Sequence, residues 1–172
     1  TIPDKREAQQ FEGSHIKVVS SQSIEGWSRV RGGWNNGDAY TVYFSLLSDV
    51  PFTVESTNEK LCLVAFSSEK VNLKIGVSFL SCEKARANIT SCSFNDQLST
   101  LKSEWQRMLS RLRYQGTERN MRMFYTALYH TMLMPVNRTG ENPKWTDSPY
   151  YDDYYAIWDT YRTSTPLLGV YY

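Results

Sequence analysis

The sequence lacks the features of several functional classes. No apolar run approaches the roughly 18 residues that a membrane-spanning helix needs, so no membrane segment is predicted. The net charge is only +1, which removes the electrostatic argument for a nucleic-acid or anionic-membrane partner. No phosphate-binding loop, dinucleotide-binding glycine motif or G-x-S-x-G elbow occurs, so none of these three chemistries is indicated.

Histidine and cysteine are scarce. The two histidines, His15 and His130, stand far apart and match no zinc-binding spacing. His130 lies in the helical pattern TALYHTML, which favours a structural role for its ring over metal binding. The three cysteines are an odd number, which predicts a free thiol or a partner outside the chain. They are Cys62, Cys82 and Cys92, and the candidate disulfide joins Cys82 to Cys92.

Two features bear on the cellular compartment. The chain begins Thr-Ile-Pro-Asp, without a methionine, a basic segment or an apolar leader, so we expect any signal peptide to lie upstream or to have been removed. N-glycosylation sequons occur at Asn88 and Asn137. Together with the candidate disulfide they favour an oxidising compartment over the cytosol, and we expect a secreted protein.

The first 80 residues carry the pattern of antiparallel strands. Residues 60–66 and 71–80 are β-branched and apolar, as strands buried on at least one face are. In residues 39–47 alternate side chains are apolar and define one predicted buried face, made of Tyr40, Val42, Phe44 and Leu46. About six strands at short spacing predict part of an antiparallel β-sandwich.

A glycine-rich segment, RGGWNNG, lies between two of these predicted strands. Its Gly-Gly and Asn-Gly pairs are typical of a hairpin loop, and a loop between strands is a better interpretation than a phosphate-binding loop before a helix. The hairpin would present Trp34 at its tip. An exposed tryptophan there is a candidate platform for a sugar ring.

Helical periodicity replaces the strand pattern at about residue 95. Apolar residues recur at helical spacing from Leu98 to Leu112, and Gly116 is predicted to end that run. Thr117 is the predicted N-cap of the next helix, which Pro135 stops. The change from strands to helices predicts a domain boundary, and we expect the chain to be a piece of a larger protein.

Acidic and aromatic residues concentrate near the end of the chain. Aromatic residues make up 14% of the sequence, including 12 Tyr and 5 Trp, and exposed aromatic faces suit carbohydrate rings. A third helix is predicted to start near Asp152 or Asp153. The carboxylates of these two residues are adjacent and point in different directions, so they make a poor acid–base pair for glycoside hydrolysis. The acidic residues of this region are Glu141, Asp147, Asp152, Asp153 and Asp159.

Asp159 follows Trp158 and precedes Arg162 by three residues. On a helix, Asp159 and Arg162 would share a face. The spacing permits two interpretations, a structural ion pair beside a packed tryptophan or a carboxylate that binds sugar hydroxyls. The pattern alone leaves both open.

Four segments resemble one family of enzymes. They are IGVSFLSCEKARANI (75–89), WQRMLSRLRYQG (105–116), RMFYTALYHTMLMPVNRTGENPKW (122–145) and YYDDYYAIWDTYRTSTPLL (150–168). In this order they resemble glycoside hydrolase family 92, the exo-acting α-mannosidases, and the fungal-type members in particular. The resemblance covers essentially the whole chain.

The resemblance implies an α+β fold of two domains, the C-terminal half of an antiparallel β-sandwich and the first helices of an (α/α)6 barrel. The expected parts are a sandwich over residues 1–95, a linker helix over 96–116 and the start of the catalytic barrel over 117–172. It also implies a calcium-dependent, inverting enzyme that removes terminal α-linked mannose, with α-1,2 linkage expected, from glycans.

The resemblance assigns roles to a few residues. Trp158 and Asp159 match the box whose aspartate binds the terminal mannose, and Trp34 and Arg162 are further candidates for substrate binding. Ala156 stands where many members have serine. The general acid, the base and the calcium ligands are expected beyond Tyr172, in the remaining part of the same protein. The alternative is a non-catalytic carbohydrate-binding or structural fragment.

Overall fold

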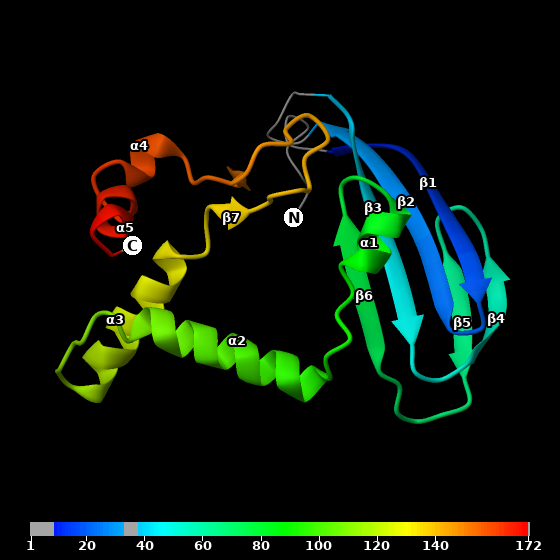
Figure 1. Cartoon of the computed structure of the whole chain (residues 1–172), viewed down its shortest axis with the longest axis horizontal. Helices are drawn as coiled ribbons and strands as arrows, with labels where there is room; N and C mark the ends of the chain where they lie inside the picture. Colours follow the sequence, from blue (N-terminus) through cyan, green and yellow to red (C-terminus); the bar gives the residue numbers. More distant parts are fainter. Residues whose placement is uncertain (1–8, 33–37, 172) are drawn as a thin grey trace. The chain divides into compact units, whose positions relative to one another are not determined.

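The structure is a computed structural model that describes residues 9–32 and 38–171. Contacts within the chain divide it into two compact units. Unit 1 consists of Thr1–Thr90 together with Glu141–Lys144, and unit 2 consists of Ser91–Gly140 together with Trp145–Tyr172. Antiparallel strands precede most of the helices along the chain (Figure 1), so the α+β class is confirmed.

Unit 1 is built on antiparallel strands, and each of the three strand predictions over 39–47, 60–66 and 71–80 is confirmed. A separate two-stranded sheet pairs β4 (Phe52–Thr57) with β5 (Cys62–Phe66). The main sheet has four strands in the order β1 (Gln9–Ser20), β2 (Ser23–Gly32), β3 (Tyr40–Ser48) and β6 (Leu73–Ser78).

Helix α1 (Cys82–Ala87) covers one face of the main sheet (Figure 1). In the strand register Glu25 pairs with Ser45 and Ser45 pairs with Gly76, so these three residues form a row across the sheet. The backbone of α1 lies directly over Gly76, because a Cβ added there would overlap the carbonyl oxygen of Ala85. The absence of a side chain at Gly76 is therefore what lets the helix sit this close.

The predicted buried face of β3 is not the most buried one. Phe44 and Leu46 remain partly exposed, whereas Ser45 on the opposite face is fully buried. The reason is a polar cluster beneath α1: the Ser45 hydroxyl donates to the Glu25 carboxylate at 3.1 Å, and Arg86 Nε donates to the same oxygen at 2.6 Å. A buried polar side chain is tolerated when it has such partners.

Unit 2 contains the predicted helical segments, α2 (Phe94–Leu109) and α3 (Glu118–Thr131). Ser93 and Asp96 form a reciprocal capping box at the start of α2. The predicted cap of α3 is confirmed, since the Thr117 hydroxyl accepts from the Asn120 backbone. The remaining elements are β7 (Val136–Asn137), β8 (Tyr151–Asp152), α4 (Ile157–Thr160) and α5 (Ser164–Tyr171).

Two predicted helix ends are wrong. Helix α2 ends at Leu109, with Ser110 as its C-cap, and does not continue to Gly116. The third helix does not begin near Asp152 or Asp153: Asp152 belongs to β8, and Asp153 has a left-handed backbone with φ of 59°. A right-handed helix cannot start from that conformation, so the next helix, α4, begins at Ile157.

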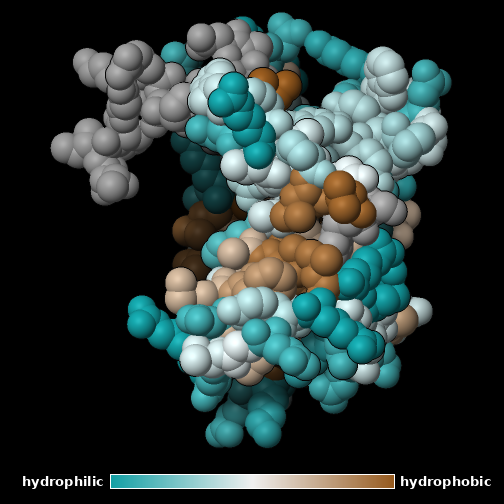
Figure 2. All heavy atoms as spheres, turned by 90° about the vertical axis from the view of Figure 1, so that its left-hand side faces the viewer, coloured by the Kyte–Doolittle hydropathy of each residue, from teal (hydrophilic) through white to brown (hydrophobic). Residues whose placement is uncertain are grey.

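Much apolar surface remains exposed. Figure 2 views the side on which α3, α4 and α5 lie in Figure 1 and shows apolar residues, in brown, gathered on that surface. Helices α4 and α5 expose Ile157, Leu167 and Val170 in particular. Within the described residues, none of the helices has the length and apolar character that crossing a membrane requires.

Candidate functional site

A small hairpin leads the chain into the segment that contains Asp159. Strands β7 and β8 pair antiparallel, and between them the Tyr150 backbone N–H donates to Thr139 Oγ1 at 3.0 Å. Arg138 closes the hairpin by donating from Nη2 to the Asp153 carboxylate at 2.7 Å. The direction of the chain toward α4 is therefore fixed by side-chain bonds as well as by the ladder.

Helix α4 is short and is held mainly by backbone acceptors. The Thr160 hydroxyl donates to the Ala156 carbonyl at 3.2 Å, and Thr163 donates to the Asp159 carbonyl at 3.0 Å. Just before the helix, the Tyr155 hydroxyl donates to the His130 carbonyl at the end of α3 at 3.3 Å. The His130 ring lies beside Tyr129, with 5.7 Å between ring centroids.

The Asp159 carboxylate is exposed, and within the described residues no hydrogen bond or ion pair engages it. The neighbouring Trp158 side chain is 78% exposed. The ion pair that the sequence spacing allows does not form, because α4 ends at Thr160 and Arg162 falls in the turn that follows. Arg162 instead places its guanidinium 5.0 Å from the centroid of the Tyr161 ring.

Three of the other clustered carboxylates have structural partners. Asp153 pairs with Arg138, and Asp152 accepts from the Tyr150 hydroxyl at 3.0 Å. Glu141 belongs to unit 1 and is described next. Asp147 is exposed and, within the described residues, has no ion pair or side-chain hydrogen bond. The structure thus distinguishes Asp147 and Asp159 from the rest of the cluster as unengaged acids.

Glu141 accepts three hydrogen bonds in unit 1. Its Oε2 accepts from Ser78 Oγ at 2.7 Å and from the Phe79 backbone at 3.0 Å, and its Oε1 accepts from Asn88 Nδ2 at 2.7 Å. Burial by itself raises the pKa of Glu141, but the Ser78, Asn88 and Phe79 bonds outweigh it and hold the pKa below its usual value. Glu141 is therefore an ionised structural acceptor.

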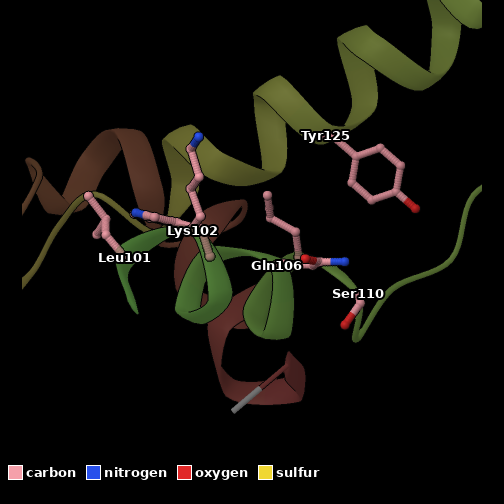
Figure 3. Close-up of a pocket in the computed structure, with 7 residues that line it drawn as sticks. Leu101, Lys102, Gln106, Ser110 and Tyr125 are labelled. Carbon is pink, nitrogen blue, oxygen red and sulfur yellow. The ribbon is translucent and has the colours of Figure 1, made fainter. Parts of the chain in front are cut away.

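One groove between α2 and α3, lined by residues that include Leu101, Trp105 and Tyr125, does not provide glycosidase chemistry. It has a volume of about 520 Å³. Lys102 and Gln106 are contributed by α2 and Tyr125 by α3 (Figure 3). No carboxylate lines it, whereas glycoside hydrolysis needs two. The Tyr125 hydroxyl is already bonded to the Leu112 carbonyl at 3.2 Å.

The described residues contain no cluster of acidic side chains of the kind that commonly binds calcium. Calcium takes six to eight oxygen ligands, and residues 9–32 and 38–171 bring no three carboxylate, imidazole or thiol groups together as a metal site would. Trp34, the fourth substrate-binding candidate, lies outside the described residues.

The candidate disulfide between Cys82 and Cys92 is not formed, since none of Cys62, Cys82 and Cys92 belongs to a disulfide in the described part of the chain. The Cys82 thiol instead donates to the Gly26 carbonyl at 3.5 Å. Burial, followed by the nearby Glu25 carboxylate, raises the pKa of this thiol. A thiol held in its protonated form is a poor participant in disulfide exchange.

Substitution of Ala156 by serine is expected to stabilise α4. Ala156 is the N-cap residue and makes no side-chain capping bond. A serine hydroxyl there can accept from a free N–H of the first turn, which is worth about 1 kcal/mol. The measurement is the melting temperature of Ala156→Ser against wild type, with Ala156→Val as control because valine cannot cap. Equal melting temperatures for the two variants would contradict the expected gain.

Comparison with known proteins identifies relatives of this chain in sequence and in fold. The chain is 29% identical over 103 residues to an "uncharacterized secreted glycosidase" of Arthroderma benhamiae, covering 54% of this chain and 13% of the relative. The fold is similar to that of the family GH92 α-mannosidase BT3965 from Bacteroides thetaiotaomicron, with a TM-score of 0.70 and 20% identity. That match covers 93% of this chain and 26% of the other, and the same values hold for that enzyme in complex with mannoimidazole.

The chain thus spans only a part of the length of these relatives. The profile of the glycosyl hydrolase family 92 catalytic domain matches residues 81–172, which include the β7–β8 hairpin, α4 and Asp159. This segment is more than half of the 172 residues. The chain therefore belongs to glycosyl hydrolase family 92.

Proposed function

We propose that the protein carrying this chain is a secreted, calcium-dependent exo-α-mannosidase that removes terminal α-1,2-linked mannose from glycans with inversion. Family membership supports a glycosidase, and the name of the fungal relative supports secretion. In this proposal the chain contributes part of an N-terminal sandwich, over residues 1–95, a linker over 96–116 and the start of an (α/α)6 barrel over 117–172. The rest of the same protein completes the barrel.

The observation that carries the proposal is the state of Asp159. It lies within the segment that matches the family, its carboxylate is exposed and unengaged, and it stands beside an exposed tryptophan. A free carboxylate accepts two hydroxyl hydrogens of a sugar through charge-assisted bonds. The Trp158 ring offers an apolar face to the same sugar.

In this proposal, residues of the present chain bind the substrate and do not perform the proton transfers. Asp159 and Trp158 hold the terminal mannose, and Arg162 and Trp34 add contacts to it. An inverting glycosidase also needs an acid and a base about 6.5–9.5 Å apart, with room for a water molecule. We assign that pair, and the calcium ligands, to the part of the protein beyond Tyr172.

The proposal is tested by assaying the whole protein on mannobiosides of α-1,2, α-1,3, α-1,4 and α-1,6 linkage. We expect mannose release to be fastest from the α-1,2 disaccharide, with the β-anomer observed first by NMR. Binding of mannosides without any turnover would overturn the proposal and favour a carbohydrate-binding module instead.

Removal of calcium is expected to abolish this activity. Treatment with EDTA should reduce mannose release to background, and added Ca²⁺ should restore it. Added Mg²⁺ serves as the control, because the smaller ion requires octahedral geometry and should restore little activity. Full activity in excess EDTA would show that calcium has no role in the reaction.

A further inference from the structure

The two N-glycosylation sequons have the same sequence pattern but different structural surroundings. Both follow the form Asn-x-Thr, at Asn88 and at Asn137. Both asparagines are exposed, so solvent access does not distinguish them. The difference lies in what the acceptor atom, the side-chain nitrogen Nδ2, already binds.

At Asn88 both hydrogens of Nδ2 are in use. Asn88 is the C-cap residue of α1, and its Nδ2 donates to the Val77 carbonyl of β6 at 2.9 Å and to Glu141 Oε1 at 2.7 Å. The side-chain amide therefore joins the end of α1, strand β6 and the segment Glu141–Lys144 within unit 1. We call this set of bonds the Asn88 clamp.

A glycan on Asn88 is incompatible with the Asn88 clamp. The sugar carbon would replace one hydrogen of Nδ2 at a C–N distance of about 1.45 Å, and each hydrogen now points at an oxygen less than 3 Å away. One acceptor is a strand carbonyl and cannot turn aside. The other is the Glu141 carboxylate, which Ser78 and Phe79 hold through two further hydrogen bonds.

At Asn137 the nitrogen that would carry the glycan, Nδ2, donates no hydrogen bond within the described residues. The side-chain oxygen accepts from the Thr139 backbone N–H at 3.0 Å, in a local Asx turn. Within the described residues, Nδ2 has no hydrogen-bond acceptor and the side chain is exposed. A glycan there adds to the surface of the β7–β8 hairpin without breaking a bond of unit 2.

We propose that, of the two sequons in this chain, Asn137 is the one that carries an N-glycan in the secreted protein and Asn88 is an unmodified structural donor. A chain that receives a glycan on Asn88 before it folds cannot form the Asn88 clamp. The folded, secreted protein therefore contains few chains that are glycosylated at Asn88. The proposal rests on passage through the secretory pathway, which is part of the proposed function, but not on mannosidase activity.

The test is a measurement of occupancy at each sequon. The whole protein is expressed in a eukaryotic host behind a heterologous signal sequence, so that entry into the secretory pathway is imposed by the experiment. The secreted protein is treated with peptide N-glycosidase in ¹⁸O-labelled water, and the peptides are analysed by mass spectrometry. We expect the ¹⁸O label at Asn137 and unmodified asparagine at Asn88.

Matched variants make each assignment independent of the other. Thr90→Ala destroys the first sequon and keeps the Asn88 amide, so we expect no change in the glycan mass of the secreted protein. Asn137→Gln is expected to lower that mass by one glycan. A labelled Asn88, an unlabelled Asn137 or a loss of glycan in Thr90→Ala would each overturn the proposal.

The structural part of the proposal has its own measurement. Asn88→Asp keeps the size of the side chain, but it removes both donors and sets a second carboxylate against Glu141. We expect a melting temperature several degrees below that of Thr90→Ala, which lacks the same sequon and retains the Asn88 clamp. Equal melting temperatures for these two variants would overturn the assignment of Asn88 as a structural donor.

Discussion

Gly76→Ala is expected to destabilise unit 1 by about 3 kcal/mol, because the new methyl group has no space. It would overlap the Ala85 carbonyl oxygen of α1 and lie 2.8 Å from Ile89 Cγ1. The Ile89 side chain can rotate away, but the backbone of α1 can yield only by lifting from the sheet. For a unit of about 90 residues, this corresponds to a melting temperature lower by roughly 10–20 °C.

The measurement is thermal unfolding followed by circular dichroism, together with hydrogen exchange of the α1 amides, which should exchange faster in the variant. Gly169→Ala is the control for the same chemical change. Gly169 lies in α5, and a Cβ added there would meet no atom within 4 Å. If Gly76→Ala had the same melting temperature as Gly169→Ala, the close contact between α1 and β6 would not be a feature of the folded protein.

Asp159→Asn in the whole enzyme is expected to lower kcat/KM for mannosides by about 10²-fold or more. Hydrogen bonds to a charged group are worth about 1.5–3 kcal/mol, and asparagine replaces one accepting oxygen with a donor. Because the Asp159 carboxylate makes no hydrogen bond or ion pair within the described residues, the melting temperature should remain unchanged. A loss of activity without a loss of stability distinguishes substrate binding from a structural role.

Asp147→Asn is the matched control, since Asp147 is also exposed and unengaged in the described residues and lies outside α4. We expect less than a twofold change in kcat/KM for this variant. Wild-type kinetics for Asp159→Asn would leave Asp159 without a role in sugar binding. The substrate-binding proposal would then lose the observation that carries it.

Local sequence signals predicted the elements that depend on local chemistry. Thr117 begins α3 as expected, because an N-cap and the apolar spacing after it are both contained within one segment. Asp159 and Arg162 show the limit of such signals. Their spacing suits an ion pair on a helix, but α4 is too short to contain both residues.

Features that depend on distant partners could not be predicted. Ser45 is buried in a cluster in which its hydroxyl binds Glu25, 20 residues earlier in the chain, and Glu25 in turn binds Arg86 of helix α1. Glu141 lies near the other acids of this region in sequence, whereas its donors Ser78 and Asn88 lie 63 and 53 residues earlier. No periodicity or motif links positions so far apart.

Strand β6 has two unlike faces, and the difference bears on how this protein should be handled. One face carries Gly76 and Ser78 and receives α1 and Glu141. The other carries Leu73, Ile75 and Val77, which are between 47% and 61% exposed, on a strand at the edge of the described sheet. An aliphatic row on an edge strand is a template for pairing between molecules, so the isolated 172-residue chain is expected to aggregate when concentrated.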